Sequence, residues 1–82
     1  MNMDVTSPVT REVIIEFLHE VLGVEGLVNL VDNYHLSYIF GYRNTYFFEV
    51  RADIFASVHV KITDLRRRPI GWITLYKEDL SR

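Results

Sequence analysis

The sequence predicts an α+β fold in which an N-terminal helical hairpin packs on one face of a roughly four-stranded antiparallel meander sheet. Two observations predict it. Up to Asp32, apolar residues recur every three to four positions, which is the period of an amphipathic helix. From Tyr34 onward they recur every second position, which is the period of a strand with one buried face. Because the chain has 82 residues and no linker composition, we expect a single domain over residues 1–82.

The first predicted helix begins at Pro8, which suits the first helical position, and Ser7 before it can act as N-cap. Thr10 is the competing N-cap. Its apolar side chains form two rows with a spacing of four, which together make one broad stripe. We expect the row with Phe17 to be buried against the sheet, and Ile15 to point toward the polar side. The first row is Val9, Val13, Phe17 and Val21, and the second is Ile14, Leu18 and Leu22.

Gly23 is predicted to end the first helix as a C′ residue in the left-handed conformation. Beyond it, apolar residues repeat at helical spacing between Val24 and Val31, which indicates a second, shorter helix over residues 25–32. Gly26 lowers the helix propensity of this segment by about 1 kcal/mol. The two helices together would form the hairpin.

Four alternating runs separated by turn signals predict the strands. Arg43-Asn44-Thr45 is a turn because Asn tolerates a positive φ, and the charged segment 64–69 is a loop. Ala52-Asp53 is a weaker turn signal, so residues 46–62 form either two strands or one long bent strand. The expected runs cover residues 34–42, 46–51, 54–63 and 70–76.

The ends of the chain and its composition exclude several classes of protein. Residues 1–6 and 78–82 are expected to fray, and the tail from Lys77 frays or forms one helical turn. The chain has no cysteine, so disulfides and thiolate metal sites are excluded. No N-terminal apolar leader is visible, and no apolar run approaches the roughly 20 residues that span a bilayer. We therefore expect a cytoplasmic protein that does not enter the membrane.

Charge is distributed unevenly along the chain, whose net charge is −2. Residues 1–33 carry one basic and six acidic side chains, whereas residues 34–82 carry eight basic and five acidic ones. The helical half is thus acidic and the sheet half mildly basic. This division is typical of Glu-rich helix surfaces, and it also fits a polarised surface that orients a partner.

Alternation with period two divides the strand residues between two faces of the sheet. The expected core face is apolar, and the expected second face mixes histidines, charges and large aromatic side chains. The core face holds Leu36, Tyr38, Phe40, Phe48, Val50, Val58, Val60, Ile62, Ile73 and Leu75. The second face holds His35, Ser37, Ile39, Phe47, Glu49, Ser57, His59, Lys61, Trp72, Thr74 and Tyr76.

The second face is the strongest candidate for a functional surface. Two helices can cover one face of a sheet about 19 Å wide, but not both. Ile39, Phe47, Trp72 and Tyr76 would then form a larger apolar area than a stable monomer usually exposes. Aromatic side chains with a polar fringe are typical of protein interfaces. The sequence therefore favours a non-catalytic protein-interaction or regulatory module, expected to form a homodimer or to bind a protein partner.

The same face permits a second interpretation, a single-stranded nucleic-acid-binding module. Phe47, Trp72 and Tyr76, with Lys61, would form a stacking platform. Arg66, Arg67 and Arg68 would contact phosphates beside it. An arginine run is also typical of a solvated loop that protects a sheet edge, and a pI of about 5.8 disfavours nucleic acid as a partner.

A third interpretation is a small ligand-binding domain or an enzyme. His35, Glu49, His59 and Lys61 form a polar cluster on the second face, and two histidines with a carboxylate are the donor set of one class of metal site. A half-exposed sheet face with solvated histidines has the same composition. The sequence contains no phosphate-binding glycine loop, no nucleophile elbow and no HExxH motif. We therefore assign no catalytic residue, no metal and no cofactor.

Overall fold

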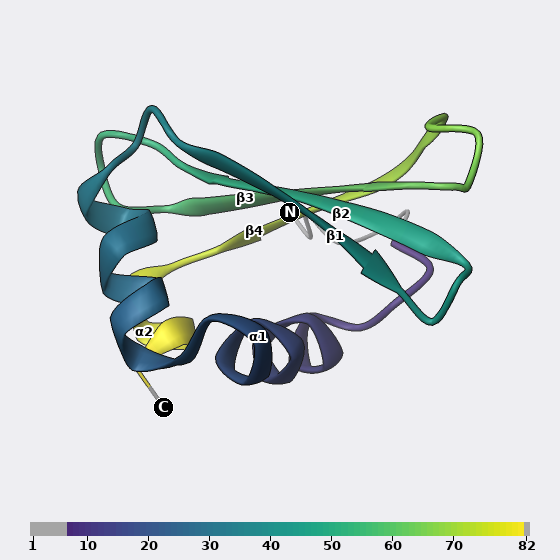
Figure 1. The fold of residues 1–82 in the computed structure, drawn as a ribbon. Coiled ribbons are helices and arrows are strands. Elements are labelled where there is room, and N and C mark those ends of the chain that lie inside the picture. Colours follow the sequence, from purple (N-terminus) through teal and green to yellow (C-terminus); the bar gives the residue numbers. More distant parts are fainter. Residues whose placement is uncertain (1–6, 82) are drawn as a thin grey trace.

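The computed structural model of the chain describes residues 7–81. A helix, four strands and a short helix follow one another along the chain (Figure 1). They are α1 (Arg11–Asp32), β1 (Ser37–Tyr42), β2 (Tyr46–Ala52), β3 (Val58–Thr63), β4 (Pro69–Leu75) and α2 (Lys77–Leu80). The strands pair antiparallel in the order β1-β2-β3-β4, which confirms the predicted four-stranded meander and separates residues 46–62 into two strands.

The predicted N-terminal helical hairpin is not found, because the structure has one long helix that bends. Gly23 has φ 68° and ψ −178°, a backbone region almost reserved for glycine and distinct from the left-handed helical conformation expected there. Helical geometry resumes immediately afterwards, so no loop lets the chain run back antiparallel. The first half of α1 lies under the sheet, and the second half turns away at one end of it (Figure 1).

Thr10, the competing N-cap of the sequence, caps α1. Its hydroxyl accepts a hydrogen bond from the Val13 N–H at 3.2 Å. The Ser7 hydroxyl accepts instead from the Val9 N–H, within a short turn ahead of the helix. The helix therefore begins at Arg11 rather than at Pro8.

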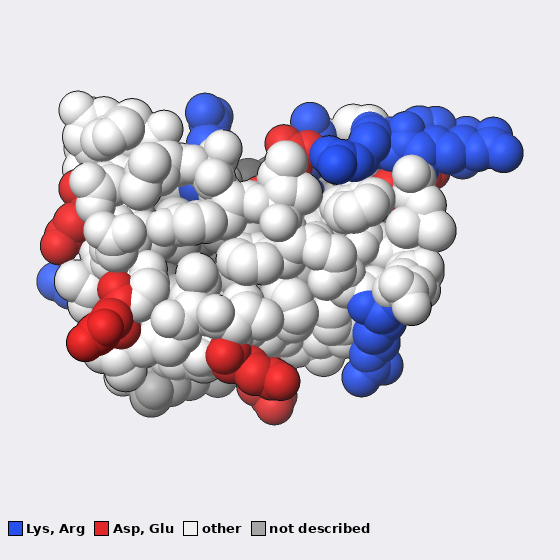
Figure 2. Space-filling view, in the orientation of Figure 1, with Lys and Arg blue, Asp and Glu red and all other residues white. Residues whose placement is uncertain are grey.

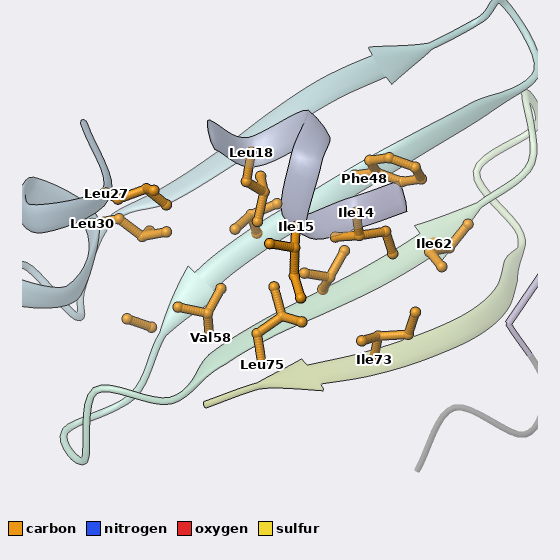
Figure 3. Close-up of a cluster of buried hydrophobic side chains, with 13 residues drawn as sticks. Ile14, Ile15, Leu18, Leu27, Leu30, Phe48, Val58, Ile62, Ile73 and Leu75 are labelled. Atoms are coloured by element: carbon orange, nitrogen blue, oxygen red, sulfur yellow. The ribbon is translucent and has the colours of Figure 1, made fainter. Parts of the chain in front are cut away.

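The centre of the helix face lies on the row with Leu18, not on the row with Phe17. Ile14 and Leu18 are fully buried, and Ile15, expected on the polar side, is only 4% exposed. Val21, expected to be buried, is 42% exposed. The prediction was wrong for Ile15 because this side chain lies beside Leu75 of β4 (Figure 3). The sheet therefore covers a wider part of the helix surface than the two predicted apolar rows.

Phe17 nevertheless joins the helix to the sheet through aromatic contacts. Its ring meets those of Phe40, Tyr42 and Phe48 edge to face, with centroids 5.8, 5.3 and 5.4 Å apart. Such pairs add about 0.5–1.5 kcal/mol each beyond the area they bury. Phe17 is half-buried because these partners lie toward the outer strand β1.

The inner face of the sheet carries the residues predicted for the core except Leu36, which precedes β1 and is half-buried outside the core cluster. Side chains from β2, β3 and β4 are at most 1% exposed, whereas Tyr38 and Phe40 on the edge strand β1 are half-buried. Alternation therefore assigned the faces correctly, and edge position set the degree of burial. The fully buried side chains of this face are Phe48, Val50, Val58, Val60, Ile62, Ile73 and Leu75.

The β2–β3 and β3–β4 turns have the same hydrogen-bonding pattern. Each begins with an aspartate, Asp53 or Asp64, whose Oδ1 accepts from the backbone N–H groups two and four residues later. Each also holds a non-glycine residue at positive φ, Ala56 at 63° and Arg67 at 66°. This is the pattern of a type I turn followed by a left-handed residue. The aspartates thus define the predicted loop at residues 64–69 and the turn at Asp53 that the sequence signalled only weakly.

The C-terminal segment is tied to the start of α1. Arg11 forms an ion pair with Asp79 at 3.2 Å and donates to the Thr74 carbonyl. The Asp79 carboxylate also accepts from the Tyr76 N–H at 2.8 Å, at the start of α2. Residues 78–80, which were expected to fray or to form one helical turn, lie in this short helix. The expected fraying of residues 1–6 and 82 lies outside the described residues. Within residues 7–81, no helix is long and apolar enough to cross a bilayer.

The bend in α1 generates the first testable prediction. We expect Gly23→Ala to lower the free energy of unfolding by about 1–3 kcal/mol, because alanine is strained in this backbone region. No atom lies within 4 Å of the position that a Cβ would take, so the cost is conformational rather than steric. Urea unfolding followed by circular dichroism measures it.

Gly41→Ala is the matched control. A Cβ at this position meets only the Phe47 Cε1 atom at 4.0 Å, and the backbone needs no positive φ. We expect its stability to change by less than about 0.5 kcal/mol. Equal stability of the two variants would contradict the role assigned to Gly23.

Candidate functional site

No helix or strand among residues 7–81 covers the sheet face opposite α1, and we call this surface the open face (Figure 1). The strand register arranges it in rows that run across the sheet. These rows correspond to the second face predicted from the sequence. The open face consists of Ser37, Ile39, Phe47, Glu49, Arg51, His59, Lys61, Trp72 and Thr74.

One row, which we call the central row, contains Ile39, Glu49, Lys61 and Trp72 as direct cross-strand neighbours. Ile39 and Trp72, at its two ends, are 51% and 54% exposed. Between them the Lys61 Nζ lies 4.0 Å from the Glu49 Oε2. From β1 to β4, the side chains of the central row are thus apolar, acidic, basic and apolar.

A neighbouring row carries a hydrogen-bonded histidine. The His59 Nε2 lies 2.8 Å from the Asp53 Oδ2, and the His59 Nδ1 lies 3.3 Å from the Thr74 Oγ1. The hydrogen bond with His59 holds the pKa of Asp53 below its ordinary value, and the backbone N–H groups of Phe55 and Ser57 act in the same direction. His59 thereby links the β2–β3 turn to β4.

The predicted polar cluster lines one shallow hollow on the open face. His35, Glu49, His59 and Lys61 all border this hollow of about 540 Å³, together with Trp72. Within this set Lys61 pairs with Glu49, whereas His59 pairs with Asp53, which lies outside it in the β2–β3 turn. Among residues 7–81, no three His, Asp or Glu side chains converge on a common metal position. The hollow offers cationic and aromatic side chains for contact.

The other two predicted interface residues lie away from the central row. Phe47 belongs to the next row, and the Arg67 guanidinium covers its ring, with Cζ 4.3 Å from the ring centroid. Tyr76 is 47% exposed just beyond β4, at the N-cap of α2. Ile39 and Trp72 therefore remain the main exposed apolar groups within the face.

The arginine run forms the tip of the β3–β4 hairpin. The Arg68 Nε donates to the Asp64 Oδ2 at 2.7 Å and closes the turn. The pKa of Asp64 is lowered first by the Arg68 backbone N–H and then by its side chain. Arg66 and Arg67 are exposed. The three predicted arginines therefore have different environments: one is paired, one lies on an aromatic ring and one extends into solvent.

Two surface features escaped the sequence reasoning. Arg51 lies on the open face between Ser37 and His59, a position that strict alternation along β2 would have supplied. A second groove of about 570 Å³ runs between the second half of α1 and α2. Its apolar lining includes Val24 and Val28, which are exposed, whereas Leu27 and Leu30 of the same half of the helix are buried in the core.

The lowered pKa values generate a pH prediction. A carboxylate whose pKa is lower in the folded state stabilises the fold above its unfolded value of about 3.9, and this stabilisation is lost as pH falls through the folded value. We therefore expect the melting temperature to fall more steeply below about pH 4 in the wild type than in Asp53→Asn/Asp64→Asn. Asparagine keeps the turn acceptors, and Glu20→Gln/Glu25→Gln on the helix surface removes the same two charges and is the control. Parallel curves for wild type and double variant would contradict the assignment.

No protein-family model matches the chain, and neither the curated proteins nor the solved structures contain a match. The functional interpretation therefore rests on the geometry of the open face and of the turns that border it.

Proposed function

We propose that this chain is a cytoplasmic, non-catalytic protein-interaction module that self-associates through the open face. The observation that carries the proposal is the central row, in which an ion pair lies between two half-exposed apolar side chains. Exposed apolar groups of this kind favour burial against a partner.

The charge pattern of the central row favours a second copy as the partner. A two-fold axis parallel to the strands, between β2 and β3, would place each β2 over the partner's β3 and each β1 over the partner's β4. Glu49 would then face the partner's Lys61, and Ile39 would face the partner's Trp72. Such self-complementarity is what an isologous interface requires.

The alternative two-fold axis, perpendicular to the strands, is disfavoured by the same residues. It would place each strand over its own copy, so that Glu49 faces the partner's Glu49 and Lys61 faces the partner's Lys61. Like charges placed opposite each other cost several kcal/mol in an interface. The axis parallel to the strands also keeps the two sheets within the aligned packing that sandwiches adopt.

The size of the face limits the affinity. Four strands about 4.8 Å apart and six residues long at about 3.4 Å each give a flat area of about 20 × 20 Å per copy. Two such faces bury on the order of 1,000 Å², which is at the lower end of specific interfaces. We therefore expect a dissociation constant in the micromolar range.

A charge-swap experiment tests this arrangement. Glu49→Lys and Lys61→Glu should each raise the dimer dissociation constant at least tenfold, because each places like charges opposite one another. An equimolar mixture of the two variants should recover association as a heterodimer, and the double variant should self-associate like the wild type. Sedimentation velocity measures all four samples.

Recovery in the mixture is the result that a merely destabilised fold would not give. Loss of association in both single variants without recovery would show that Glu49 and Lys61 do not face each other. A wild type that remains monomeric at hundreds of micromolar would overturn self-association itself.

Trp72 supplies an independent prediction because it is the only tryptophan of the chain. Dilution of the wild type should shift its emission to the red, since dissociation admits water to the indole. Trp72→Ala should lower the sedimenting mass while leaving the far-ultraviolet circular dichroism unchanged. Phe55→Ala, at the β2–β3 turn, is the control and should leave the mass unchanged. Emission that is blue and insensitive to dilution would contradict an interface at Trp72.

A further inference from the structure

The end of the sheet that holds the β1–β2 and β3–β4 turns carries two separate groups of basic side chains (Figure 2). Arg43 lies in the first turn, and Arg66, Arg67 and Arg68 lie in the second. We call these four residues the basic end. The β2–β3 turn and the second half of α1 lie at the opposite end (Figure 1), so positive charge is concentrated locally although the net charge is −2.

Among residues 7–81, three of the four guanidinium groups have no carboxylate partner, since only Arg68 forms an ion pair. Arg43 lies over the ring of the preceding tyrosine at 5.3 Å, and Arg67 lies over Phe47 at 4.3 Å. A ring beneath a guanidinium restrains its plane and leaves its N–H edge free to donate. Arg66 is exposed beside them.

We propose that the basic end binds the phosphodiester backbone of single-stranded nucleic acid. Arginine donates to phosphate oxygens in a fork geometry, and three forks without a carboxylate partner lie on two turns at the same end of the sheet. Arg67 favours a single strand, because its guanidinium lies over the Phe47 ring and the residue is exposed, so that an unstacked base can contact it. In a duplex the bases are stacked on one another and cannot reach it.

The acidic half of the chain does not prevent this binding. The molecule extends 30 Å along its longest axis, whereas charges about 10 Å apart are already largely screened at 0.1 M salt. Asp64, the acidic residue of the β3–β4 turn, is engaged by Arg68. A phosphate at the basic end therefore experiences the local arginines more strongly than the distant acidic helix.

Fluorescence anisotropy of a labelled oligo(dT) of about 15 nucleotides tests the proposal. With three phosphate contacts, the logarithm of the binding constant should fall against the logarithm of salt with a slope of about −2. The matched duplex and inorganic polyphosphate with the same number of phosphates are the comparison ligands. The single strand should bind more tightly than either.

Substitutions locate the site. Arg43→Gln, Arg66→Gln and Arg67→Gln should each weaken binding about fivefold at 0.1 M salt and each reduce the slope by about 0.7. Lys77→Gln on α2 removes the same charge at a distance and is the control. Arg67→Lys should keep the slope and lose affinity for oligo(dT) but not for polyphosphate, because lysine lacks the planar stacking surface.

Each outcome decides the proposal. Equal affinity for polyphosphate and oligo(dT), or tighter binding of the duplex, would overturn a single-strand site, and equal effects of Lys77→Gln and Arg66→Gln would overturn its location. No binding at 20 mM salt would remove the function. Trp72→Ala should still bind oligo(dT) as a monomer, with the same loss on Arg66→Gln, so failure of this proposal and failure of self-association are distinguishable.

Discussion

Ile14 and Leu18 of α1 reach the inner face of the sheet, and the contact they make there decides which face of every strand is buried. Once that face is fixed, period-two alternation directs the remaining side chains of the strands outward. Within residues 7–81 the helices form one layer only, since the first half of α1 lies under the sheet and the second half, with Leu27 and Leu30 buried, lies at one end of it. The open face, the central row and the exposed indole of Trp72 all follow from this one-sided covering.

The strand faces could be predicted from the sequence because alternation is a local property, and Phe48, Val60 and Ile73 lie where it places them. The helical hairpin could not. Gly23 signals that regular helix is interrupted, but the direction of the chain beyond it depends on a ψ angle that composition does not specify. The prediction for Ile15 was wrong for a related reason. Its burial depends on how close it lies to β4, which is a tertiary property.

For the candidate site, too, the sequence indicates which residues share a face of the sheet but not which of them are in contact. His35, Glu49, His59 and Lys61 border one hollow, and grouping them on one face needs only the parity of their positions. Their contacts needed the strand register, which pairs Glu49 with Lys61 and leaves His59 to Asp53 of the neighbouring turn. The difference between the three arginines of the hairpin tip likewise depends on tertiary geometry, because Phe47, which lies beneath Arg67, is distant in sequence.

The two proposed surfaces constrain each other through symmetry. A two-fold axis parallel to the strands keeps the strand direction, so it would bring the basic ends of both copies to the same end of a dimer. Their arginines would repel one another at low salt, and that repulsion would be screened as ionic strength rises. A bound phosphodiester strand would neutralise the same charges. The central row and the basic end would therefore be coupled electrostatically although they share no residue, and the coupling would have the sign of mutual reinforcement, because a ligand that relieves the repulsion favours the assembled state.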